Sequence, residues 1–283
     1  MIYHIGEILL LHVKRLQTAL NLDAGTARIE VQILLQAVLS VNRAYLLTHP
    51  ERVLTEDEFS RYSALFERRH KGEPIAYLLG EREFYGLNFK VTPDTLIPRP
   101  DTELLVELAL QHIPQHGMCR VLDMGTGSGA IALAIAHQRP DAKVVALDAS
   151  MAALEVAAEN AQRLGISNVH FLHSDWFAQL SGERFDLIVS NPPYIEAGDV
   201  HLSQGDVRFE PTSALASGAD GLDDIRRILL AAKDHLNTGG WLMFEHGYDQ
   251  AERVRQLMRQ HGYAEVASMP DLSGIERVTL GCA

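Results

Sequence analysis

The fold is decided by residues 121–136, which read VLDMGTGSGAIALAIA. An apolar segment, Val121–Met124, runs straight into three glycines within five residues, and an apolar helical pattern begins at Ala130. Glycine permits a tight turn from strand to helix and lets a ligand approach the backbone where a side chain would clash. The order of strand, glycine loop and helix therefore predicts a small-molecule site at the carboxyl edge of a parallel sheet.

Apolar runs and helical patterns alternate on both sides of this loop. Seven runs are expected as strands: Val121–Met124, Val144–Leu147, Val169–Leu172, Leu187–Val189, Trp241–Phe244, Ala264–Ala267 and Arg277–Leu280. The helical patterns are Thr102–His112, Ile131–His137, Ala152–Leu164, Asp224–Leu236 and Gln250–His261. Strands that alternate with helices of this length form βαβ units, so we expect an α/β domain with a mostly parallel seven-stranded sheet covered on both faces.

The first 70 residues show helical periodicity instead. Apolar residues recur at three- and four-residue steps over about 5–20 and 29–41, and a third pattern spans Glu56–Arg69. Thr55 is expected to cap this third helix, with Glu58 three residues further on. A basic cluster at its end is interpreted as a solvated helix face, with a partner-docking patch as the alternative: Arg61, Arg68, Arg69 and Lys71.

Between the two parts, short apolar runs at Glu83–Tyr85 and Leu87–Val91 predict a hairpin. We therefore expect three regions. They are a small helical bundle over residues 1–80, a hairpin linker over 81–98 and the α/β domain over 99–283.

Composition and charge narrow the class of protein. The chain has 283 residues, with 25 Lys and Arg against 37 Asp and Glu, which gives a formal charge of −12. Residues 1–90 carry 11 basic and 11 acidic side chains, so the whole excess lies in 91–283, with 14 basic against 26 acidic. Such an acidic domain repels a nucleic-acid backbone. The two cysteines, Cys119 and Cys282, fit a reducing cytoplasm, and no apolar run approaches membrane-spanning length.

Asp148 is expected at the end of the second strand, 19 residues after Gly129. A carboxylate there can accept both hydroxyls of a ribose, which indicates an adenosine-type nucleoside and leaves its identity open. Asp175 and Trp176 follow the third strand at the same edge. Trp176 offers a flat face to adenine, and its packing in the core is the alternative. No Lys follows the last glycine, which argues against a phosphate-cradling ATPase loop.

The most specific motif is Asn191-Pro192-Pro193-Tyr194, which follows the strand Leu187–Val189. Two prolines fix φ and remove two N–H donors, so the loop presents acceptors. The side-chain oxygen of Asn191 and the carbonyl of Pro192 can then hold both hydrogens of a planar NH₂ group, on which Tyr194 can stack. Such a nitrogen is a poor nucleophile because its lone pair is delocalised, so fixing both N–H bonds favours its reaction.

The tetrapeptide and the glycine loop resemble those of class I S-adenosylmethionine-dependent amino-methyltransferases. Four further segments closely resemble the release-factor glutamine methyltransferases, the HemK/PrmC family: Gly72–Tyr77, Phe84–Leu87, Leu96–Glu103 and Asp206–Pro211. This resemblance spans nearly the whole chain. It implies a Rossmann-like class I methyltransferase domain joined to a helical N-terminal domain that recognises the substrate.

The resemblance also implies a reaction and its residues. In that family S-adenosyl-L-methionine methylates the side-chain amide of the glutamine in the Gly-Gly-Gln motif of peptide chain release factors, and S-adenosyl-L-homocysteine leaves. By this resemblance the methionine part of the cofactor is contacted by Gly125, Thr126, Gly127, Ser128 and Gly129, the ribose by Asp148 and the adenine region by Trp176. Asn191 bridges cofactor and substrate, the catalytic residues are Asn191, Pro192 and Tyr194, and the glutamine is bound by Asn191, Pro192, Pro193 and Tyr194. No metal, direct nucleic-acid partner or membrane is expected.

Three alternatives remain open at this stage. A DNA adenine methyltransferase would hold its exocyclic amine with the same tetrapeptide, but the acidic domain argues against it. An NAD-dependent dehydrogenase fits Gly125, Gly127, Ala130 and Asp148 and leaves the tetrapeptide unexplained. A catalytically silent binding module is the third. His246 is interpreted as a loop or packing residue and not as a catalytic base.

Overall fold

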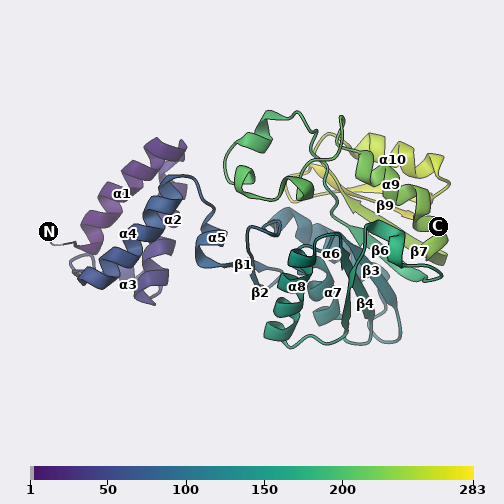
Figure 1. Ribbon diagram of the computed structural model, residues 1–283, viewed down its shortest axis with the longest axis horizontal. Helices are drawn as coiled ribbons and strands as arrows, with labels where there is room; N and C mark the ends of the chain where they lie inside the picture. Colours follow the sequence, from purple (N-terminus) through teal and green to yellow (C-terminus); the bar gives the residue numbers. More distant parts are fainter. Residues whose placement is uncertain (1–2) are drawn as a thin grey trace. The chain divides into compact units, whose positions relative to one another are not determined.

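The computed structural model describes residues 3–283, and its contacts divide the chain into two compact units (Figure 1). The first unit runs to Gly80 and includes Ser203–Phe209, whereas the second comprises Glu81–Leu202 and Glu210–Ala283. Ser203–Phe209 thus belongs by its contacts to the helical unit, although it lies in the sequence range expected for the second domain. Within residues 3–283 we find no helix that is both long and apolar enough to span a membrane.

The first unit is a helical bundle. Its helices are α1 (Ile5–Leu20), α2 (Ala24–Leu39), α3 (Arg43–Thr48), α4 (Glu56–His70) and α5 (Ile75–Leu79). The core of the bundle includes Leu16, Leu34, Tyr62 and Phe66, all fully buried. At the start of α4 the Thr55 side chain accepts from the Glu58 N–H, and the Glu58 side chain accepts from the Thr55 N–H. This capping box confirms the predicted start of the third helical pattern.

The basic cluster of α4 is not a uniform solvated face, and that prediction was wrong for Arg69. The Arg69 side chain is buried and ion-paired with Glu30, with N–O distances of 2.8 and 2.9 Å. Its Nη1 also lies 2.9 Å from Asp206, within the segment Ser203–Phe209. A buried guanidinium needs such partners because its desolvation is costly. Arg61 is exposed, as expected.

The second unit is an α/β domain built on seven strands. They are β3 (Arg120–Met124), β4 (Lys143–Asp148), β5 (Val169–His173), β6 (Phe185–Ser190), β7 (Leu236–Glu245), β8 (Ala264–Pro270) and β9 (Glu276–Cys282). Their order in the sheet is β5-β4-β3-β6-β7-β9-β8, and β9 pairs antiparallel with both of its neighbours. The predicted mostly parallel seven-stranded sheet is confirmed.

Helices cover both faces of this sheet (Figure 1). They are α6 (Glu103–His112), α7 (Ala130–Gln138), α8 (Met151–Leu164), α9 (Asp223–Ala232) and α10 (Ala251–Gln260). Side chains alternate along a strand, so Val121 packs in the cluster with α6 and α7, whereas Leu122 packs in the cluster with α9 and α10. The helix predicted over Asp224–Leu236 was too long at its C-terminal end. The observed helix α9 ends at Ala232, and Leu236 already pairs with Phe185 in the sheet.

The predicted hairpin is present as β1 (Glu81–Phe84) and β2 (Leu87–Lys90), paired antiparallel. Both turn residues, Tyr85 and Gly86, have positive φ, as the type I′ hairpin turn requires. The buried side chain of Asn160 in α8 accepts from the Lys90 N–H at 2.7 Å and donates to the Ser128 carbonyl at 2.9 Å. Asn160 thereby ties the hairpin to the glycine loop.

Candidate active site

A cavity of about 520 Å³ opens at the carboxyl ends of the parallel strands. This volume lies within the range of small-molecule sites. Its lining contains six of the predicted site residues: Gly125, Gly127, Asp148, Trp176, Asn191 and Pro193. The other predicted residues are not part of this lining: Thr126, Ser128, Gly129, Pro192 and Tyr194.

The glycines of the loop differ in what they face. All three have positive φ, at 73° for Gly125, 56° for Gly127 and 83° for Gly129. A Cβ on Gly129 would lie 3.0 Å from Leu133 and 3.1 Å from Ala157, so this glycine allows α7 and α8 to pack closely. A Cβ on Gly127 would meet nothing within 4 Å. Gly127 therefore leaves its side of the cavity open to a ligand.

Asp123, the fourth residue of β3, holds the glycine loop through hydrogen bonds. Sequence reasoning did not assign this residue to the site. Its Oδ2 accepts from the Thr126 hydroxyl at 2.6 Å and from the Ala132 N–H at 3.2 Å. Asp123 and Thr126 are both buried. Burial raises the pKa of Asp123 to about 7, although the hydrogen bond from Thr126 acts to lower it. Thr126 thus shapes the loop through Asp123.

The raised pKa of Asp123 makes stability depend on pH. Its pKa in the unfolded chain is about 4, so between about pH 4 and 7 the folded state holds a proton that the unfolded state releases. Its contribution to the free energy of unfolding should therefore fall with rising pH, by about 1 kcal/mol per pH unit. Asp123→Asn cannot titrate. Urea titrations at about pH 5.5 and 7.5 should show the wild type losing stability relative to this variant, and a constant difference would contradict the assignment.

Asp148 lies at the end of β4, and its carboxylate faces the cavity. Its Oδ2 accepts from the Gly127 N–H at 2.9 Å and its Oδ1 from the Ser150 N–H at 2.8 Å. Burial raises the pKa of Asp148, and these backbone donors act in the opposite direction. Each carboxylate oxygen has a second acceptor position, so Asp148 can still bind two hydroxyl groups.

Trp176 lies three residues after the end of β5 and has a left-handed φ of 48°, which is unusual for a bulky residue. The Ser174 hydroxyl donates to the Trp176 carbonyl at 2.7 Å and holds this turn. A Cβ on Gly125 would lie 3.9 Å from two atoms of the indole ring, so the ring lies close to the glycine loop. Asp175 forms an ion pair with Arg227 at 3.0 Å. Arg227 also lines the cavity, and sequence reasoning missed it.

Asn191 follows the last residue of β6 and lines the cavity together with Pro193. Its Nδ2 donates to the Thr102 hydroxyl oxygen at 3.2 Å. Because the amide nitrogen is directed at Thr102, Oδ1 is the group that Asn191 can offer to a ligand. The Asn191 amide is therefore oriented so that its oxygen can accept a hydrogen bond from an N–H group of a ligand.

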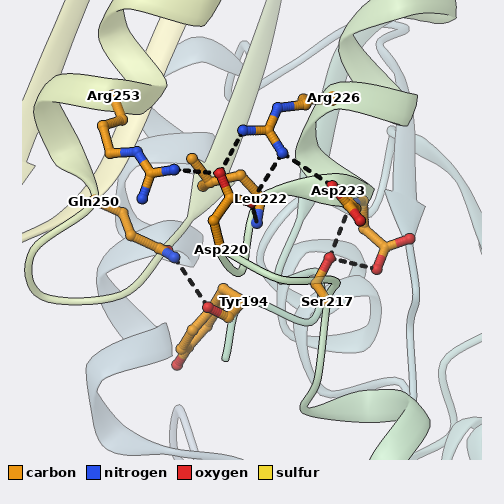
Figure 2. Close-up of polar contacts among 9 residues, drawn as sticks. Tyr194, Ser217, Asp220, Leu222, Asp223, Arg226, Gln250 and Arg253 are labelled. Carbon is orange, nitrogen blue, oxygen red and sulfur yellow. Dashed lines mark hydrogen bonds and ion pairs between the residues drawn. The ribbon is translucent and has the colours of Figure 1, made fainter. Parts of the chain in front are cut away.

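Tyr194 is held at both ends, and Figure 2 shows the contact of its carbonyl with Gln250. Its carbonyl accepts from Nε2 of Gln250 at 3.0 Å, and its hydroxyl lies 3.4 Å from Oε1 of Glu245. Burial raises the pKa of Tyr194 above its ordinary value, with the neighbouring Glu245 acting in the same direction. Sequence reasoning did not identify Thr102, Glu245 or Gln250 as site residues. Of these, Thr102 lies in the motif segment Leu96–Glu103, which was a signal that could have found it.

His246 is a packing residue, as predicted. It is fully buried, and its ring nitrogens lie 2.9 Å from the Gly247 carbonyl and 2.8 Å from the Thr279 hydroxyl. Burial lowers its pKa.

This strand order, with a glycine loop after the central strand β3 and an Asn-Pro-Pro-Tyr loop after β6, defines a class I methyltransferase. The family model for the methyltransferase small domain matches residues 102–210, and the model for the PrmC N-terminal domain matches residues 7–80. Among solved structures, a methyltransferase from Pyrococcus furiosus shares the fold with a TM-score of 0.53 and 22% identity, over 78% of this chain and 98% of that one.

Curated relatives identify the family more closely. A release factor glutamine methyltransferase from Aliivibrio fischeri is 47% identical over 271 residues, which cover 95% of each chain. One from Salmonella typhimurium is 50% identical over 259 residues, which cover 92% of this chain and 93% of the relative. The chain belongs to the release factor glutamine methyltransferase family. This membership favours the glutamine methyltransferase interpretation over a DNA adenine methyltransferase, an NAD-dependent dehydrogenase or a silent binding module.

Proposed function

We propose that the chain methylates the side-chain amide nitrogen of the glutamine in the Gly-Gly-Gln motif of peptide chain release factors. The observation that carries this proposal is the orientation of Asn191, whose Nδ2 is directed at Thr102 so that Oδ1 is left for an N–H group at the cavity. The names of the curated relatives support the choice of a release factor as substrate.

The residues of the cavity fit S-adenosyl-L-methionine. Residues 125–129 would hold its methionine part, Asp148 its ribose hydroxyls and Trp176 its adenine. The open space at Gly127 and the remaining acceptor positions of Asp148 support this assignment. The cofactor supplies an electrophilic methyl group on a sulfonium. We propose that no metal takes part, because such a methyl needs no further activation.

The chain's own contribution is to orient the glutamine amide. The Asn191 Oδ1 and the Pro192 carbonyl would accept its two N–H bonds, and Tyr194 would stack on its plane. These contacts fix the nitrogen and oppose the delocalisation of its lone pair. Holding a nucleophile in line in this way can lower a barrier by about 7 to 11 kcal/mol. The Pro192-Pro193 pair has no N–H donors to compete for these acceptors.

We also propose that the helical unit, which the PrmC N-terminal domain model matches over residues 7–80, recognises the body of the release factor. The place of action would be the cytoplasm. The unpaired state of Cys119 and Cys282 fits such a reducing compartment.

Replacing Asp148 by Ala should weaken cofactor binding by about 10- to 100-fold, because the change removes hydrogen bonds from hydroxyl groups and from the loop itself. Calorimetric titration with S-adenosyl-L-homocysteine measures this loss. Asp141→Ala, at an exposed position outside the cavity, is the matched control and should bind normally. Affinity within twofold of wild type in the Asp148 variant would remove Asp148 from the cofactor site.

Methyl-labelled S-adenosyl-L-methionine tests the function directly. The protein is incubated with a release factor, with the same factor carrying Gly-Gly-Ala in place of Gly-Gly-Gln, and with duplex DNA. We expect label on the first substrate alone. Label on DNA, equal label on the Gly-Gly-Ala factor, or no label on the intact factor would overturn the proposal.

A further inference from the structure

Four side chains are linked at the edge of the cavity by two hydrogen bonds and by the action of Thr102 on Glu245. Asn191 donates through Nδ2 to the Thr102 hydroxyl oxygen at 3.2 Å. The Thr102 hydroxyl acts on the neighbouring carboxylate of Glu245 as a hydrogen-bond donor that lowers its pKa, and the Tyr194 hydroxyl lies 3.4 Å from Oε1 of the same carboxylate. Among the described residues, the other oxygen, Oε2, is buried without a hydrogen-bond partner of its own. Thr102 is 5% exposed and Glu245, the last residue of β7, is 2% exposed. The two outer residues of the amide-binding loop are therefore joined through one buried acid.

The direction of each hydrogen bond follows from the donors available. A threonine hydroxyl has one hydrogen, and because its oxygen accepts from Asn191, that hydrogen is free for Glu245. Tyr194 keeps its hydrogen because burial raises its pKa, so its hydroxyl also donates to Glu245. An ionised carboxylate only accepts, and it thus orients both hydroxyls towards itself. In this arrangement the Asn191 amide has its nitrogen at Thr102 and its oxygen available to a ligand.

We infer that Thr102 and Glu245 are positioning residues, which together hold the Asn191 amide with Oδ1 towards the substrate and fix the Tyr194 ring beside it. The inference rests on the proposed function, since it assigns an orienting role for the same amide-binding loop. It gives a reason for Thr within the motif segment Leu96–Glu103 and for an acid at the carboxyl end of β7.

Protonation of Glu245 would reverse this arrangement. The charged groups that face it are Asp101 and Arg277, themselves 3.7 Å apart, and its hydrogen-bond partners are Thr102 and Tyr194. Burial raises the pKa of Glu245 to about 7, the hydrogen bonds from Thr102 and Tyr194 oppose this rise, and Asp101 adds to it. A protonated Glu245 donates, so Thr102 can turn its hydrogen to Asn191 and the amide can flip. The flipped amide presents N–H groups to the substrate, and transfer slows.

Thr102→Val and Thr102→Ser form a matched pair that tests the first link. Valine keeps the shape of threonine without the hydroxyl, whereas serine keeps the hydroxyl. We expect Thr102→Val to lower kcat for release-factor methylation by about 10- to 100-fold while the affinity for S-adenosyl-L-homocysteine stays within about twofold. Thr102→Ser should retain kcat within about threefold. Wild-type kcat in Thr102→Val, or an equal loss in both variants, would overturn the inference.

The pH profile of kcat tests the second link. In the wild type kcat should fall as pH drops below about 7, and in Glu245→Gln, which cannot titrate, this acidic limb should disappear. Persistence of the limb in the variant would overturn the role of Glu245. If Glu245→Gln fails to fold, as judged by circular dichroism, the Thr102 pair decides alone. A wild type that leaves the release factor unlabelled refutes the proposed function itself, whereas an active wild type with an unaffected Thr102→Val refutes only this inference.

Discussion

Asn191→Ala should abolish most methyl transfer, with kcat lowered by at least about 10²- to 10³-fold, because the loop loses the acceptor that orients the reacting nitrogen. The fold should survive, since Asn191 is only half-buried and follows the end of β6. Its hydrogen bond to Thr102 is the one side-chain hydrogen bond of Asn191 that the change removes from the described structure. Initial rates with labelled cofactor and release factor measure the effect.

The Asn191 prediction has a matched control in Asn88→Ala. Asn88 lies in the hairpin strand β2, is exposed and donates to Glu81. The two substitutions make the same chemical change at different places, which makes the control a matched one. Asn88→Ala should leave kcat unchanged, and both variants should bind S-adenosyl-L-homocysteine. Near-normal turnover by Asn191→Ala would show that the side-chain amide does not orient the substrate.

Much of the sheet could be predicted because most of its strands contain an apolar run bounded by turn residues. The helices α3 and α5 were missed because they have six and five residues, too few to show a periodic pattern. Local signals were nevertheless present. The Asn42 side chain caps α3 by accepting from the Tyr45 N–H at 2.9 Å, and α5 lies between Pro74 and the left-handed Gly80.

The sequence predicted those cavity residues that lie at the end of a strand or in the glycine loop. Gly127, Asp148 and Asn191 are of this kind, and the carboxyl ends of parallel strands meet at one edge. Glu245 also ends a strand, β7, but its position in the sequence does not show that it approaches Tyr194. Its approach to Tyr194 depends on the pairing of Ser190 with Phe244 in neighbouring strands, a register that spacing along the sequence does not give.

Arg69 illustrates a different limit. In the sequence it is one of several arginines near the end of α4, and nothing in the charge pattern separates it from the exposed Arg61. Its burial depends on Glu30, 39 residues earlier, and on Asp206, 137 residues later. Such long-range ion pairs are set by tertiary structure, so a helix with a mixed basic face is ambiguous until the partners are known.

Gly221 lies in a neighbouring turn that packs closely against the amide-binding loop. Asp220, which precedes it, accepts from Arg226 at 2.6 and 2.9 Å and from Arg253, so the turn is anchored by α9 and α10 (Figure 2). Gly221 has a φ of 71°, and a Cβ placed on it would lie 2.2 Å from the Tyr194 carbonyl oxygen and 2.6 Å from Nε2 of Gln250. The anchored turn cannot retreat easily, so the added carbon should displace Tyr194.

Gly221→Ala should therefore lower kcat by about 10²-fold, since misplacement of a positioning group by about 1 Å can cost that much. Gly182→Ala isolates the cause. Gly182 has a φ of 75°, and a Cβ there meets nothing within 4 Å, so this variant carries the same backbone strain, about 1 to 2 kcal/mol, without the clash. In urea titrations Gly221→Ala should lose more stability than Gly182→Ala, because the clash adds to the backbone strain. Both variants should bind S-adenosyl-L-homocysteine, but only Gly221→Ala should lose transfer. If the two variants lost activity equally, backbone strain would explain the effect and the contact with Tyr194 would not.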